Sequence, residues 1–213
     1  MHCLFAFGHF DKIPYSLFLL CWDIIMKVLH IDSSIMGKAS VSRQLSQAIV
    51  DQLKTQHEAL TVTYLDLVEQ DIPHLTADIL MGKNEEQTQL GLQLVQQYLD
   101  ADIVVIGAAM YNFGLSSALK AWIDRIAVAG KTFKYTESGS VGLAGNKKAY
   151  IASSRGGIYG DNHPADFQET MLKTVFNFTG VTDIEVVRAE GVNMGAELKE
   201  KAIAEALTKV TTL

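Results

Sequence analysis

One stretch of seven residues, IVVIGAA from Ile103 to Ala109, carries no polar side chain. An unbroken apolar strand of this kind indicates a strand covered on both faces, as in the middle of a parallel sheet between layers of helices. Parallel neighbours must be joined by long crossover connections, which are usually helices. This stretch therefore predicts that strands and helices alternate along the chain.

The chain after residue 25 shows this alternation. Amphipathic stretches separate the apolar segments, and in one of them Leu45, Ile49 and Leu53 fall on one face of a helix. The order predicts an α/β fold with a parallel five-stranded sheet, helices on both faces and right-handed crossovers. The expected strands are 27–31, 60–67, 103–109, 148–153 and 183–188, and the expected helices are 40–56, 88–99, 116–129, 165–178 and 196–210.

Composition excludes several functional classes. The chain has 213 residues and a net charge of -6 with no basic run, which argues against a nucleic acid or an anionic membrane as the main partner. Cys3 and Cys21 are the only cysteines, and the six histidines show no ligand spacing. We therefore expect no disulfide framework and no metal site.

The first 25 residues, MHCLFAFGHFDKIPYSLFLLCWDII, differ from the rest. They lack the basic start and cleavage site of a signal peptide, and the apolar run 17–22 is too short to span a bilayer. We interpret 1–25 as an extension outside the fold and 26–213 as one domain with no membrane contact, and we expect a cytoplasmic protein. A membrane-associating or partner-binding role for 1–25 is the alternative.

In open parallel sheets, ligands bind beyond the carboxyl ends of the strands. The loop DSSIMGKASVS follows the first expected strand and leads into a helix, whose free N–H groups attract phosphate. Ser34, Ser40 and Ser42 add hydroxyl donors, although any one of them could be only a helix cap. With the single glycine Gly37, the loop is neither a dinucleotide fingerprint nor a P-loop, so it predicts a monophosphate site.

The loops after the third and fourth expected strands, AMYNFGLSS and SSRGGIYGDNHPAD, suit a flat ring. Tyr111 and Phe113 offer apolar faces, Asn112 offers an amide, and Gly156 and Gly157 allow close backbone approach. A phosphate, a polar edge and a planar body together describe flavin mononucleotide (FMN). The alternative for MYNF alone is a packed turn in which Asn112 satisfies local backbone.

From Met26 onward, the chain resembles the FMN-dependent NADH azoreductases and NADH:quinone oxidoreductases of bacteria. The matching segments are KVLHIDSS with SVS, AMYNFGLSSALKAWID, GKTFKYTESG and SSRGGIY, in the order and spacing of that family. The resemblance implies a flavodoxin-like three-layer sandwich with strand order 2-1-3-4-5. It also implies bound FMN, NADH as electron donor and a homodimer.

The resemblance further implies which residues form the site. One group would hold the phosphate end, a second would line the isoalloxazine and a third would hold its other edge. Asn112 would support the reduced flavin, and no dedicated catalytic residue is expected because the flavin carries the hydride. These cofactor-binding residues are Ser34, Ser40, Val41 and Ser42; Met110, Tyr111, Asn112 and Phe113; and Ser154, Arg155, Gly156 and Gly157.

Two weaker assignments are Tyr135 and Phe178, which match aromatics around the flavin and substrate pocket, partly across a dimer interface. Phe178 also suits an ordinary core position. The implied activity takes hydride from NADH and reduces quinones and aromatic azo compounds by two-electron ping-pong transfer. Three alternatives stay open: an FMN electron carrier without its own NADH turnover, a related reductase that uses FAD, and an interaction protein without flavin.

Overall fold

The computed structural model describes residues 25–213. Apart from Ile25, the expected extension 1–25 lies outside the described residues. Within 25–213, no helix combines the length and the apolar character that a membrane span requires.

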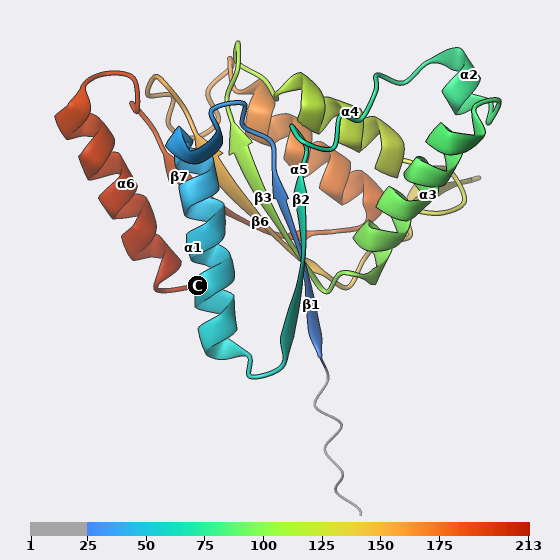
Figure 1. Ribbon diagram of the computed structural model, residues 1–213, viewed down its shortest axis with the longest axis horizontal. Coiled ribbons are helices and arrows are strands. Elements are labelled where there is room, and N and C mark those ends of the chain that lie inside the picture. The colour runs from blue at the N-terminus through green and yellow to red at the C-terminus, as the bar shows by residue number, and fades with distance from the viewer. Residues whose placement is uncertain (1–24) are drawn as a thin grey trace, which may run out of the picture.

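A five-stranded parallel sheet forms the centre of the molecule (Figure 1). Its strands lie in the order β2-β1-β3-β6-β7, and each pairs in parallel with its neighbours. The order confirms the predicted 2-1-3-4-5 arrangement, with β6 and β7 as the fourth and fifth strands of the sheet. The bounds are β1 Met26–Asp32, β2 Leu60–Asp66, β3 Ile103–Ala109, β6 Lys148–Ser154 and β7 Asp183–Ala189.

Helices cover both faces of the sheet, which confirms the predicted three layers (Figure 1). α1 (Val41–Gln56) and α6 (Ala196–Val210) lie on one face. α3 (Glu85–Asp100), α4 (Ser117–Ile126) and α5 (Phe167–Thr179) lie on the other. The side chains of β3 alternate between the two cores, because successive residues of a strand point to opposite faces.

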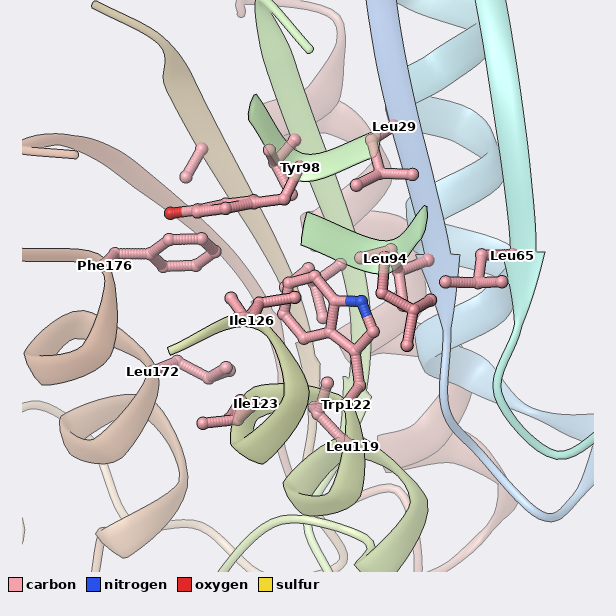
Figure 2. Close-up of a cluster of buried hydrophobic side chains, with 14 of the residues drawn as sticks. Leu29, Leu65, Leu94, Tyr98, Leu119, Trp122, Ile123, Ile126, Leu172 and Phe176 are labelled. Atoms are coloured by element: carbon pink, nitrogen blue, oxygen red, sulfur yellow. The ribbon is translucent and has the colours of Figure 1, made fainter. Parts of the chain in front are cut away.

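The core beneath α3, α4 and α5 is built around three aromatic rings (Figure 2). Tyr98 contacts Trp122 edge-on at a centroid distance of 5.9 Å and lies 6.4 Å from Phe176. The Tyr98 hydroxyl oxygen is 2.7 Å from the Thr179 Oγ1, so this buried polar atom is satisfied. Each of these rings comes from a different helix, and their contacts tie the helical layer together.

The structure adds elements that the periodicity did not predict. β4 (Phe133–Thr136) and β5 (Gly139–Gly142) form an antiparallel hairpin. Strands of four residues are too short to show a clear alternation. The sequence also did not predict a 3-10 turn, η2 (Gly37–Ala39), and the short helix α2 (Ala77–Leu80). Helical elements of three or four residues are too short to show a helical period.

The boundaries of two helices differ from the prediction by three residues at one end. α3 begins at Glu85, three residues earlier than expected, because the Asn84 side chain caps it by accepting a hydrogen bond from the Gln87 N–H at 3.1 Å. α4 ends at Ile126 instead of extending to 129. There the Thr132 hydroxyl donates to the Ile126 carbonyl at 2.7 Å and draws the chain into the hairpin.

Two glycines should respond oppositely to alanine. In β3, a Cβ on Gly107 would overlap the Asp32 carboxylate and lie 3.1 Å from the Ser46 Oγ, so Gly107→Ala should lower the free energy of unfolding by about 1–3 kcal/mol. On α3, a Cβ on Gly91 would meet only ordinary contact, so Gly91→Ala should raise it by about 0.5–1 kcal/mol. Urea unfolding of both variants measures these shifts; a neutral Gly107→Ala would contradict the packing described.

Candidate functional site

The loops that follow β1, β3 and β6 meet at one cavity of about 220 Å³. It lies at the carboxyl edge of the sheet, where the sequence placed a ligand. The structure thus brings together residues from all three predicted segments. Of the predicted cofactor-binding residues, those that line the cavity are Ser34, Ser40, Val41, Met110, Tyr111, Ser154 and Gly156. The others do not line it: Ser42, Asn112, Phe113, Arg155 and Gly157.

The predicted serines of the first loop differ in their surroundings: Ser34 and Ser40 line the cavity, whereas Ser42 does not. Ser40 caps α1, because its Oγ accepts a hydrogen bond from the Arg43 N–H at 3.3 Å, and it also lines the cavity. Ser42 is fully buried, with its Oγ 3.1 Å from the Ser40 Oγ. Ser34 presents its hydroxyl 3.0 Å from the hydroxyl of Tyr111. The capping alternative and the binding hypothesis are therefore compatible at Ser40.

Arg43 holds the first loop in place. Its Nε and Nη2 donate to the Ser34 carbonyl at 3.2 and 2.9 Å. The same guanidinium makes a two-pronged contact with the Asp66 carboxylate, at 2.5 and 2.8 Å. The hydrogen bond from Arg43 lowers the pKa of Asp66 below its ordinary value. The loop conformation thus depends on an ion pair between α1 and β2.

A buried polar cluster lies next to this ion pair. The Ser46 hydroxyl donates to Asp32 at 2.7 Å, and the His30 Nε2 lies 3.0 Å from the Ser46 Oγ. Tyr64 donates to the same carboxylate at 3.1 Å, and burial together with the Asp32 charge raises the pKa of Tyr64 to about 12. Ser, His and Asp occur here together, but Ser46 donates to the carboxylate, and all three side chains are buried. The arrangement is therefore structural and not that of an activated nucleophile.

The MYNF segment forms a strained turn. Tyr111 and Gly114 exchange backbone hydrogen bonds of 3.0 and 2.9 Å around a two-residue loop. Asn112 and Phe113, the two central residues, have φ values of 48° and 69°. Asparagine tolerates this left-handed conformation, but a bulky residue such as phenylalanine adopts it at a cost of about 1–3 kcal/mol. The Phe113 side chain is half exposed.

The loop after β6 carries Gly156 and Gly157 and is called the twin-glycine loop here. Backbone hydrogen bonds hold it on both sides. The Met110 N–H donates to the Ser154 carbonyl at 2.8 Å, which joins this loop to the MYNF turn. On the other side, the Asn193 N–H donates to the Gly156 carbonyl at 3.2 Å. A Cβ on Gly156 would lie 2.7 Å from the Asn193 Nδ2, so a larger residue would displace that side chain. Gly157, also predicted, lies next to Gly156 but does not line the cavity.

Arg155 has a different place from the one expected. Its side chain is fully buried and does not line the cavity. It forms ion pairs with Asp166 at 2.5 Å, Glu169 at 2.7 Å and Glu190 at 3.2 Å. We therefore assign the Arg155 side chain to holding the loop, whereas only its neighbours Ser154 and Gly156 reach the cavity.

Glu169 is the most heavily paired carboxylate of this network. It also accepts hydrogen bonds from the Arg188 Nε and Nη2, both at 2.8 Å. Burial alone would raise the pKa of Glu169, but the hydrogen bonds from Arg188 and the charges of Arg155 and Arg188 outweigh it, so the pKa lies below the ordinary value.

Tyr135 and Phe178 lie apart from the cavity. Phe133 contacts both rings, at centroid distances of 5.4 and 4.4 Å. Phe178 follows Phe167 by 11 residues in α5, a rise of roughly 16 Å along the helix. Because the Phe167 N–H donates to the Phe113 carbonyl, that rise separates Phe178 from the MYNF turn. Tyr135 lines a second cavity of about 530 Å³ between α3, α4 and the hairpin.

Sequence reasoning missed a fourth segment of the site. Val192, Asn193 and Lys199 line the same cavity from the loop after β7 and the first turns of α6. The signal was available, because EGVNMG also follows a parallel strand at the carboxyl edge. It lacks the serines and aromatics that distinguish the other three loops.

Comparison with known proteins agrees with this geometry. Residues 26–213 match a family described as having a flavodoxin-like fold. The chain belongs to this flavodoxin-like family. Among its relatives is an FMN-dependent NADH:quinone oxidoreductase of Stenotrophomonas maltophilia (strain K279a), which is 55% identical over 182 residues, 85% of this chain and 93% of the relative.

Solved structures of the same fold include an azoreductase from Bacillus anthracis str. Sterne. It is 30% identical, covers 88% of this chain and 97% of its own, and has a TM-score of 0.80. An FMN-dependent NADH-azoreductase from Bacillus anthracis str. Ames Ancestor, solved in complex with FMN, is 26% identical with a TM-score of 0.77. It covers 88% of this flavodoxin-like chain and 98% of its own.

The paired state of Glu169 should make stability depend on pH. Glu169→Gln removes one partner of a buried network, so we expect a loss of about 3–5 kcal/mol at pH 7. Because the folded pKa is lowered, the contribution of Glu169 is complete above its ordinary pKa of 4.5 and is lost as the pH falls through the folded value. The difference between wild type and variant in urea unfolding should therefore be constant from pH 7 to about 5 and shrink toward pH 3.

Glu185→Gln is the matched control, because Glu185 pairs with Lys148 at the surface at 3.3 Å. That variant should cost less than about 1 kcal/mol. An equal loss for both variants, or a Glu169→Gln deficit that does not change down to pH 3, would contradict the assignment.

Proposed function

We propose that the protein is an FMN-dependent NADH:quinone oxidoreductase that also reduces aromatic azo compounds. The observation that carries the proposal is the single cavity that joins a serine-capped helix start, the MYNF turn and the twin-glycine loop. Relatives that share about half of their residues with this chain are named as this enzyme.

The residues around the cavity fit FMN. Ser34, Ser40 and the start of α1 supply hydroxyl and N–H donors for a phosphate. Gly156 lines the cavity without a side chain, so its backbone can approach a flat ring. Met110 and Tyr111 add apolar surface between these two ends. Hydroxyl donors, apolar walls and a glycine cradle are the combination that a flavin with one phosphate requires.

When bound, FMN would supply the hydride chemistry between NADH and a quinone or azo compound, whose two-electron reduction also takes up two protons. The chain's own task is therefore to bind and orient. Phe113 does not line the cavity, but its half-exposed ring lies on the same turn as Tyr111 and offers an apolar face to a second planar molecule. The Asn112 amide can donate to negative charge that develops beside the turn, an electrostatic contribution that needs no proton transfer.

The comparisons favour this activity over an electron carrier without turnover. The relatives and structural neighbours described above are named as reductases, and one neighbour was solved with FMN. The same names weigh against a flavin-free interaction protein and against FAD as the cofactor.

We also infer that the active protein is a homodimer in the cytoplasm. The inference for the dimer rests on Tyr135, which is 75% exposed and lies beside Phe133 and Phe178, away from the cavity of its own chain. Because Tyr135 and Phe178 lie apart from the cavity of their own chain, they can border only a flavin that a second copy of the chain holds. Sedimentation of the full chain at several concentrations tests the dimer; a monomer at all concentrations would remove Tyr135 and Phe178 from the site.

The purified protein should absorb in the flavin bands and bleach when NADH is added without an acceptor. Because donor and acceptor use one pocket in turn, double-reciprocal plots at several quinone concentrations should be parallel. Stopped-flow absorbance and steady-state rates measure both. Flavin that NADH does not bleach would favour the electron carrier, and intersecting lines would contradict the shared pocket.

Asn112→Gly tests the amide without disturbing the turn, because glycine accepts the left-handed backbone. We expect FMN affinity to fall about 3- to 10-fold, the effect of one lost hydrogen bond. Asn146→Gly is the matched control, since Asn146 has φ of 64° and precedes β6, whereas Asn112 directly follows Tyr111, which lines the cavity. Flavin fluorescence titration measures both; equal affinity in the two variants would remove Asn112 from the flavin site.

A further inference from the structure

The cavity contains one formally charged side chain among its lining residues, that of Lys199. The other groups at the phosphate end, Ser34 and Ser40, are neutral. A phosphate monoester carries about -1.5 to -2 charges at neutral pH. Neutral donors can satisfy its oxygens, but a cation within reach adds the stronger, charge-assisted interaction.

The other cations of this region are committed or lie outside the cavity. The Arg43 guanidinium is engaged by Asp66 and by the Ser34 carbonyl. Arg155 is buried among three carboxylates. Lys38 belongs to the neighbouring turn η2, yet it does not line the cavity. Lys199 is therefore the lysine whose position suits a ligand charge.

The position of Lys199 is unfavourable without an anion. It lies in the first turns of α6, near the positive end of the helix dipole, where a lysine is destabilising. Gly195, the N-cap residue, provides no side-chain hydrogen bond to that helix start. Within residues 25–213, no carboxylate lies within 4.0 Å of the Lys199 ammonium, whereas the nearby Lys201 pairs with Glu205. A bound anion would pair with the Lys199 ammonium and would also interact favourably with the N–H groups at the start of α6.

Two helices also start at this edge. α1 and α6 pack against each other on the same face of the sheet, and both begin at the edge where the strands end (Figure 1). Ser40 lines the cavity at the start of α1, and Lys199 lines it from α6. A phosphate between them would meet free N–H groups, a hydroxyl and an ammonium at once.

We propose that Lys199 is the counter-charge for the phosphate of FMN, and that it makes this site select FMN over riboflavin. The inference rests on the proposed FMN site and assigns to it a cation that the serine loop and the twin-glycine loop do not supply. Because the ammonium interacts only with the phosphate end, its removal should leave binding of the ring and the ribityl chain unchanged.

The test compares two ligands that differ only in the phosphate. The full chain is stripped of flavin and titrated with FMN and with riboflavin, and the quenching of flavin fluorescence gives each dissociation constant. Lys199→Gln should raise the dissociation constant for FMN about 5- to 30-fold and change that for riboflavin less than two-fold. Lys199→Arg should keep most of the preference for FMN, and added salt should weaken FMN binding more in wild type than in Lys199→Gln.

Two controls separate Lys199 from its neighbours. Lys201→Gln, on the same helix and outside the cavity, and Lys38→Gln, on the adjacent turn, should both leave the preference for FMN intact. Unchanged FMN binding in Lys199→Gln, an equal loss for both flavins, or a selective loss in Lys38→Gln instead would overturn the proposal. A wild-type chain that binds neither flavin would overturn the FMN site itself, a result distinct from these.

Discussion

The burial of β3 on both faces is the constraint on which the rest of the structure depends. Apolar residues on both sides of a strand require a helical layer on each side, and crossover helices can supply both layers only if the strands run parallel. Parallel strands place all their carboxyl ends at one edge. The loops that carry Ser34, Tyr111, Gly156 and Asn193 come from distant parts of the chain, and they meet because of this topology alone.

Buried ion pairs then fix the conformation of those loops. Arg43 with Asp66 holds the loop after β1, and Arg155 with its three carboxylates holds the loop after β6. Burying charge costs desolvation, so such pairs add little net stability even when their geometry is good. The ion pairs instead restrict the conformation of the two loops, because each is formed only when its loop has the conformation described. The strained turn at Asn112 and Phe113 needs such surroundings, because a free loop would relax it.

The sequence predicted what depends on local pattern and on topology. The parallel sheet and the three converging loops followed from apolar runs and from the edge rule, whereas the strand order followed from the family resemblance. The hairpin β4–β5 did not, because strands of four residues leave no periodic signal. The place of Arg155 could not be predicted either: a cation in a glycine loop suggests a ligand contact, and only the packing of α5 and β7 brings Glu169 and Glu190 to it.

The two ends of the proposed site differ in chemistry: one offers donors to a phosphate, and the other exposes an aromatic ring to solvent. The proposed phosphate end is lined by Ser34, by Ser40 at the start of α1 and by Lys199, and its attraction for a phosphate is electrostatic. The other end has Phe113 half exposed on a turn whose backbone is fixed. An enzyme that exchanges two substrates over one resident cofactor needs this asymmetry, because the cofactor must stay while NADH leaves and an acceptor enters. The net charge of -6 adds to this requirement: the chain as a whole repels anions, so the proposed role of Lys199 is to supply a local positive charge that helps to retain a phosphate.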